Sequence, residues 1–176
     1  IPGAGDTIPD ALERMGYTVD TLSEADMTRE ILTNYDAVVF GIRALNTNDR
    51  IGFYMPALFK YAQQGGVVVL QYNTNRGLKT MDYAPYPFTI TRDRVTDETA
   101  EMRFLAPEHP VMHFPNTITT ADFEGWVQER GLYFADDWDD AFTPIFSAND
   151  VGESPLDGSL LIAQTGEGYF VYSGLS

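Results

Sequence analysis

The side chains best suited to bind a ligand follow two short apolar runs of the sequence. The runs cover 37–40 and 67–70, and arginine and asparagine residues come soon after them: Arg43, Asn46, Asn48, Asn73, Asn75 and Arg76. Guanidinium and amide groups hydrogen-bond hydroxyls and carboxylates, so these residue types indicate recognition of a polar ligand. The alternative, which the sequence supports about equally, is that the asparagines only end loops through local hydrogen bonds.

Four aromatic side chains could stack on a sugar or an aromatic ring. They are Tyr72, Tyr83, Tyr86 and Trp126. We count Tyr72, Glu124 and Trp126, together with the six polar residues, as the candidate ligand-binding residues. Carboxylates such as Glu124 and Glu129 are also candidates for an acid and a base if the chain is an independent hydrolase.

The motifs that would identify a metal or a cofactor are incomplete. His109 and His113 have the spacing of a helical metal-binding pair, but Pro110 lies between them and no third ligand follows at a recognisable spacing. The acidic runs at 93–101 and 135–140 lack the glycine and the terminal glutamate of a calcium loop. The start of the chain resembles a dinucleotide-binding turn, but Ile8 stands where the third glycine belongs. We therefore expect no metal, no cofactor and no catalytic residue in this chain.

Composition excludes several functional classes. The 176 residues include no cysteine, which rules out disulfides, cysteine-bound zinc and thiol catalysis. The 26 acidic and 11 basic residues give a formal net charge of -15, which disfavours nucleic acid and anionic membrane surfaces as partners. No apolar run approaches the ~20 residues of a membrane-spanning helix, so we expect no membrane span.

The elements that would position the candidate residues alternate between helix and strand. Apolar spacing predicts helices at 7–15, 28–34 and 51–62, and strands at 17–21, 37–40 and 67–70. This order implies a doubly wound, mostly parallel α/β sheet of the flavodoxin-like kind, with 67–70 innermost and 37–40 parallel beside it. Because ligands bind at the carboxyl ends of such strands, we expect Arg43 and Asn73 to lie close together.

The later part of the chain has a different pattern. Prolines interrupt short apolar pieces between 73 and 159, which predicts strands and long loops. Residues 160–163 and 169–172 flank Gly166 and Gly168, which predicts a closing hairpin. We expect one domain over 1–176. We also expect it to be a fragment of a longer polypeptide, because the helix at 7–15 lacks its incoming strand.

A resemblance to a known superfamily rests on the order of elements from Gly3 to Gly77, on 109–111 and on the closing segment 166–174. The chain resembles the class I glutamine amidotransferase-like superfamily over most of its length. In those enzymes the central strand ends in a G-x-C-x-G turn that presents a nucleophilic cysteine. Here Tyr72 or Asn73 stands near the place of that cysteine. The resemblance therefore implies the fold without the glutaminase activity.

A narrower resemblance rests on short segments spread along the chain: 3–6, 41–44, 71–75, 85–88, 92–98 and 123–131. They look like the region that follows the catalytic domain in large bacterial deacetylases of the PIG-L/LmbE type. The zinc motif of that catalytic domain, A-H-P-D-D, is absent here. The resemblance implies an exported protein, periplasmic or secreted, in which a deacetylase domain precedes this chain.

The resemblance and the residues together predict a non-catalytic accessory domain that binds a saccharide or packs against the deacetylase domain. Two alternatives stay open. One is an independent hydrolase that uses carboxylates as acid and base, and the other is a structural spacer without a ligand. An A-H-P-D-D domain encoded upstream would favour the accessory domain over both.

Overall fold

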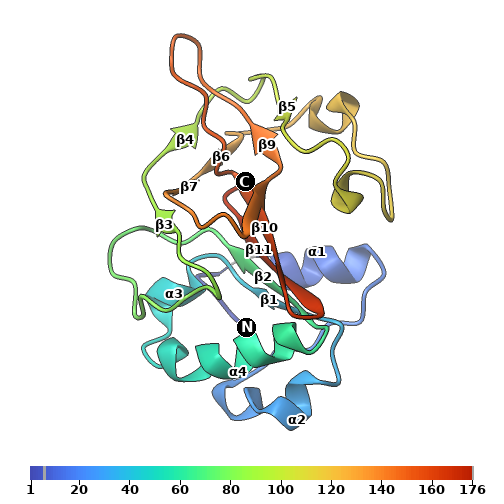
Figure 1. Cartoon of the computed structure of the whole chain (residues 1–176), viewed down its shortest axis with the longest axis vertical. Helices are drawn as coiled ribbons and strands as arrows, with labels where there is room; N and C mark the ends of the chain where they lie inside the picture. The colour runs from blue at the N-terminus through green and yellow to red at the C-terminus, as the bar shows by residue number, and fades with distance from the viewer. Residues whose placement is uncertain (6, 176) are drawn as a thin grey trace.

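A five-stranded mixed sheet forms the centre of the molecule (Figure 1). The computed structural model describes residues 1–5 and 7–175. The strands follow one another across the sheet in this order: β1 (Ala37–Phe40), β2 (Val67–Gln71), β11 (Gly168–Ser173), β10 (Leu160–Thr165) and β8 (Phe142–Pro144). β1, β2 and β11 are parallel, whereas β10 runs antiparallel to both β11 and β8.

Six short strands form three antiparallel pairs outside this sheet. They are β3 (Thr89–Ile90) with β7 (Ala135–Asp136), β4 (Arg94–Val95) with β6 (Gly131–Leu132), and β5 (Arg103–Phe104) with β9 (Phe146–Ser147). The strands and long loops predicted between 73 and 159 are thus confirmed.

The expectation of a doubly wound, mostly parallel sheet is wrong. Among the pairings within 1–5 and 7–175, only β1 with β2 and β2 with β11 are parallel. A doubly wound sheet needs a crossover helix for each new parallel neighbour. In the described chain after β2 there is no α-helix, because the proline-punctuated sequence has no helical periodicity to supply one.

The strand predictions in the first half are confirmed where the apolar runs are continuous. Val38 lies opposite Val68 and Phe40 opposite Leu70 in the parallel pair, and all four side chains are buried. The innermost position belongs to β11 and not to β2. The predicted hairpin forms as β10 and β11. A Cβ on Gly168 would lie 2.1 Å from a backbone oxygen at the start of β2, so this crossing requires glycine.

The longest helix, α4 (Ile51–Gln63), packs against the sheet through Met55, Leu58 and Ala62, as its spacing predicts. The helices predicted at 7–15 and 28–34 form as α1 (Ile8–Arg14) and α2 (Arg29–Leu32). The remaining helical pieces are α3 (Ala44–Thr47), η1 (Glu24–Asp26), η2 (Pro110–Met112) and η3 (Thr120–Phe123). In the part of the chain that the structure describes, no helix is long and apolar enough to cross a bilayer.

The strand predicted at 17–21 is wrong. These residues form no regular element, and Tyr17 is 58% exposed. Alternating side chains favour a strand only where a neighbouring strand can pair with it and a core can bury one of its faces.

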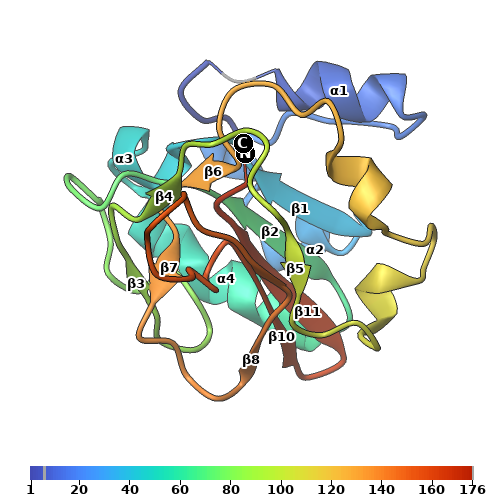
Figure 2. The same cartoon turned by 90° about the horizontal axis from the view of Figure 1, so that it is seen from above.

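The two faces of the main sheet pack into different apolar clusters. Phe40, Leu70 and Tyr172 pack with side chains of α2 and α4 on one face. Ile162 and Val171 pack with residues of the small strands on the other. In Figures 1 and 2, α2 and α4 accordingly lie on the opposite side of the main sheet from β4, β5 and β6.

Candidate functional site

The loops that leave the carboxyl ends of β1 and β2 are hydrogen-bonded to each other. The Arg43 backbone N–H donates to the Tyr72 carbonyl at 2.9 Å. The Leu45 backbone N–H donates to Asn73 Oδ1 at 2.8 Å, and Asn73 Nδ2 donates to the Gln71 carbonyl at 2.8 Å. The predicted proximity of Arg43 and Asn73 is therefore confirmed. Asn73 is fully buried, so its amide is committed to holding the two loops together.

The other asparagines of this edge also bind loop backbone. Asn46 Oδ1 accepts from the Thr74 N–H at 2.9 Å, and Asn46 Nδ2 donates to the carbonyls of Thr74 and Arg76 at 3.0 and 3.1 Å. Asn48 Oδ1 accepts from the Arg50 N–H at 3.0 Å, which closes a local turn. These contacts match the alternative in which the asparagines end loops through local hydrogen bonds.

The two arginines of this edge are exposed. Neither guanidinium takes part in an ion pair within residues 1–5 and 7–175, so neither Arg43 nor Arg76 pairs with Glu124 or Glu129. Arg43 has a φ of 59°, a left-handed conformation that is uncommon for any residue except glycine. Asn75 is half-buried beside them.

Tyr72 stacks on a residue that the sequence did not single out. Its ring and the ring of Tyr133 have centroids 6.0 Å apart and an interplanar angle of 15°. Tyr133 also has a positive φ, of 56°, and its carbonyl accepts a short hydrogen bond from the Tyr172 hydroxyl. Burial of Tyr172 raises the pKa of that hydroxyl, so it remains protonated and donates. Both rings are half-buried, and Tyr72 directly follows the last residue of β2.

Glu124 and Trp126 belong to a different region. Trp126 stacks on Phe123 at 5.5 Å, and the Arg130 guanidinium lies 5.8 Å from the centroid of each ring. Glu124 is exposed beside them. In both views, η3 lies across the molecule from α3, which follows Arg43 (Figures 1 and 2). The structure therefore does not bring these two residues together with Arg43 and Asn73.

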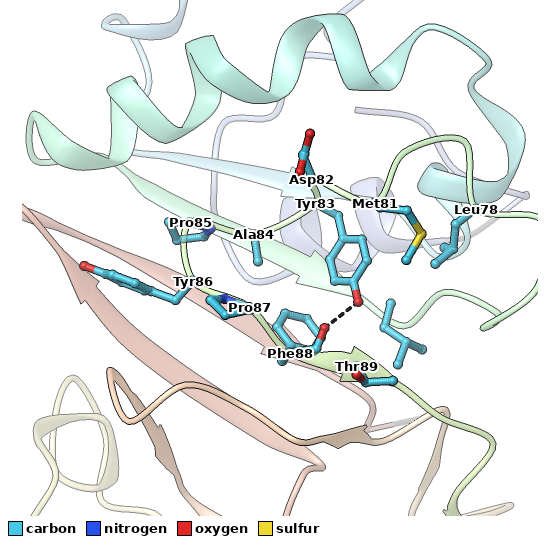
Figure 3. Close-up of a pocket in the computed structure, with 11 residues that line it drawn as sticks. Leu78, Met81, Asp82, Tyr83, Ala84, Pro85, Tyr86, Pro87, Phe88 and Thr89 are labelled. Carbon is cyan, nitrogen blue, oxygen red and sulfur yellow. Dashed lines mark hydrogen bonds between the residues drawn. The ribbon is translucent and has the colours of Figure 1, made fainter.

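The cavity next to this edge is built by the loop that continues from β2. Its volume is about 320 Å³, and residues 78 and 81–90 line it (Figure 3). We term it the loop pocket. The Tyr83 hydroxyl donates to the Phe88 carbonyl at 2.5 Å, and the two rings meet edge to face with centroids 5.2 Å apart. Both are buried, and burial raises the pKa of Tyr83.

Contacts with fixed elements position the loop pocket. The Lys79 N–H donates to the Leu45 carbonyl at 2.9 Å, and the Lys79 ammonium pairs with Asp49 at 2.7 Å. At the other end, the Tyr86 hydroxyl donates to the Gln164 carbonyl of β10 at 3.2 Å, and 89–90 pairs with β7. A loop anchored at both ends keeps its pocket formed without a ligand.

The lining combines apolar and polar groups. Leu78, Met81, Tyr83 and Phe88 supply apolar surface, and the Met81 side chain is 76% exposed at the opening. Figure 3 shows the Asp82 carboxylate turned away from the Tyr83 ring, and Asp82 is exposed. The sequence drew attention to Tyr83 and Tyr86 as aromatic residues. It gave no such signal for Leu78, Met81 or Phe88.

The described residues contain no group of three or more His, Asp or Glu side chains that could hold a metal ion. The two histidines bind loop backbone instead. His109 Nδ1 accepts from the Val111 N–H at 3.2 Å, and His113 Nε2 lies 2.7 Å from the Pro107 carbonyl oxygen. They are therefore loop-stabilising residues in this structure.

No protein-family model matches the chain, and no curated protein matches it by sequence. Solved structures match by fold. Cytoplasmic Protein STM3548 from Salmonella typhimurium aligns with a TM-score of 0.59 and 14% identity, over 93% of this chain and 72% of its own. Cytoplasmic Protein STM1381 from Salmonella typhimurium LT2 aligns with a TM-score of 0.55 and 14% identity, over 85% of this chain and 64% of its own.

A β-galactosidase from Rahnella sp. R3 aligns with a TM-score of 0.52 and 14% identity, over 94% of this chain and 23% of its own. This chain therefore spans less than a quarter of that enzyme and about two thirds of STM1381. At this identity the three similarities show a shared fold alone.

Proposed function

We propose that this chain is a non-catalytic accessory domain that binds a saccharide in the loop pocket, within a polypeptide whose catalytic domain modifies carbohydrate. The loop pocket carries the proposal, because it is a preformed cavity of about 320 Å³ directly after the carboxyl end of β2. Ligand pockets in proteins start at roughly 300 Å³, so it accommodates about one sugar ring.

The lining suits one face of a sugar. A pyranose has an apolar face of C–H groups, which packs on accessible apolar side chains such as Met81 and Leu78. Its hydroxyls project from the ring edge, where the Thr89 hydroxyl among the lining residues is a hydrogen-bonding partner. Arg43 and Arg76, exposed on the adjoining loops, are partners for a longer saccharide.

Two further observations support an accessory role. The resemblance to the region after a PIG-L/LmbE-type catalytic domain implies a neighbouring deacetylase. In the Rahnella β-galactosidase, the segment that aligns with this chain makes up 23% of the enzyme. The fold therefore occurs as a minor part of an enzyme that acts on carbohydrate.

The test is a titration of the isotope-labelled chain with N-acetylglucosamine and galactose, followed by amide resonances. We expect either sugar to shift resonances of 78–90. Met81→Ala removes an exposed apolar side chain of the lining and should weaken the response. Met15→Ala, which removes an exposed methionine elsewhere, should leave it unchanged. Absence of shifts in 78–90 with both sugars, in a chain whose spectrum is folded, would refute the proposal.

A further inference from the structure

A second cavity, of about 390 Å³, lies between the turn that leads into β4 and the loop 149–155. It is lined by Arg92, Asp93, Arg94, Thr96, Asp150, Glu153, Ser154 and Leu156. We term it the arginine groove. It shares no lining residue with the loop pocket, so it is a separate feature of the molecule.

The walls of the arginine groove are fixed by Asp150. Its carboxylate accepts hydrogen bonds from the Thr96 N–H at 3.0 Å, the Thr96 hydroxyl at 2.6 Å and the Asp97 N–H at 2.8 Å. Two backbone hydrogen bonds between Ala148 and Leu156 close the loop at its base. The loop and the strand segment are therefore held in place before any ligand arrives.

Two arginines of the groove form no ion pair within residues 1–5 and 7–175, although the charge of Arg94 helps to lower the pKa of Asp150. Arg92, in the bend before β4, and Arg94, the first residue of β4, are both exposed, and both line the groove. No ion pair or side-chain hydrogen bond within residues 1–5 and 7–175 uses either guanidinium. Asp150 lines the same groove, but its oxygens are already occupied by three donors. Two cations thus face one cavity, together with the carboxylates of Asp93, Asp150 and Glu153.

We propose that the arginine groove binds the oxyanion of a small ligand, a carboxylate or a phosphate. A guanidinium presents paired N–H donors that match two oxygens of either group. The net charge of the chain opposes binding only weakly, because charges more than about 8 Å away are screened at physiological salt. Asp93 and Glu153 at the same groove would repel a polyanion, so the ligand carries one anionic group. This inference does not rest on the saccharide proposal.

The test uses glucuronate, glucose 6-phosphate and the neutral methyl glucoside as probes, with amide resonances as the readout. We expect at least one anion to shift resonances of 92–97 and 150–156, and methyl glucoside to leave them unchanged. The Arg92→Gln/Arg94→Gln variant should lose about tenfold in affinity, which corresponds to 1.4 kcal/mol. The Arg14→Gln/Arg29→Gln variant has the same net charge and changes exposed arginines outside the groove, so it should bind like the parent.

The outcomes separate the possible sources of the anion. A response to glucuronate alone assigns the groove to carboxylates, and a response to glucose 6-phosphate alone assigns it to phosphates. Either result supports the proposal. Absence of a response to both anions overturns it, and so does an equal loss of affinity in the two double variants, because the effect would then come from net charge.

Discussion

Replacing Asn73 by leucine tests whether the buried amide holds the two strand-end loops together. The change keeps the number and branching of the side-chain heavy atoms but removes the acceptor of the Leu45 N–H and the donor to the Gln71 carbonyl. An unsatisfied buried N–H costs about 1–3 kcal/mol, and each lost hydrogen bond about 0.5–1.5 kcal/mol. We therefore expect the free energy of unfolding to fall by about 2–4 kcal/mol. For a chain of this length that loss lowers the melting temperature by roughly 5–15 °C.

Urea unfolding gives the free energy, and amide hydrogen exchange gives the local effect. The Leu45 amide should lose its protection in Asn73→Leu. Asn75→Leu is the matched control, because Asn75 lies two residues further on and is half-buried. Its cost should stay within about 0.5 kcal/mol. If Asn73→Leu is as stable as this control and Leu45 stays protected, the amide does not connect the loops.

Three further variants test the fold and its pH dependence. Val68→Asp places an unpaired charge at a fully buried position and should cost more than about 3 kcal/mol; a melting temperature within a degree or two of the parent would contradict the buried position of β2. Gly168→Ala brings a Cβ to 2.1 Å from the Gly66 oxygen, so we expect a loss above about 2 kcal/mol by urea unfolding, and an unchanged midpoint would contradict the close crossing. Burial alone raises the pKa of Asp150, but hydrogen bonds from 96–97 outweigh it and hold this pKa below the ordinary 3.8. This stabilisation is present above pKa 3.8 and is lost as the pH falls through the lowered pKa of the folded protein. In Asp150→Asn the free energy of unfolding should therefore fall less steeply with decreasing pH than in the parent. An equally steep fall in the variant would contradict this.

Local elements with strong patterns were predictable from the sequence, whereas the order of strands was not. The β-branched run 67–70 and the helical spacing of 51–62 specify their own structure, because each buries its apolar positions in only one conformation. The hairpin 160–173 follows from two apolar runs flanking a glycine turn. That β11 enters beside β2 depends on contacts about a hundred residues apart in the chain, which no local pattern encodes.

The candidate site was likewise only partly predictable from the sequence. Asn73 has one sequence signature whether it binds a ligand or a neighbouring loop, and only its complete burial distinguishes the two. The sequence around Tyr133 contains no motif that marks it as a site residue. Its stacking on Tyr72 depends on the path of a loop that is distant in the chain. Phe88 looks like an ordinary core residue, since apolar side chains that line a cavity and those that fill a core belong to the same types.

The position of β11 has a consequence for synthesis on the ribosome. It is the last strand of the described residues, yet it lies between β2 and β10. Until 168–173 has emerged, β2 presents an unpaired backbone edge, and Phe40 and Leu70 lack the cover of Tyr172. Such an open apolar edge is prone to pair with other chains, and pairing between distant segments is slow. The nascent chain therefore passes through a long interval as an incomplete sheet, and its yield in the cell depends on how well that edge is protected during translation.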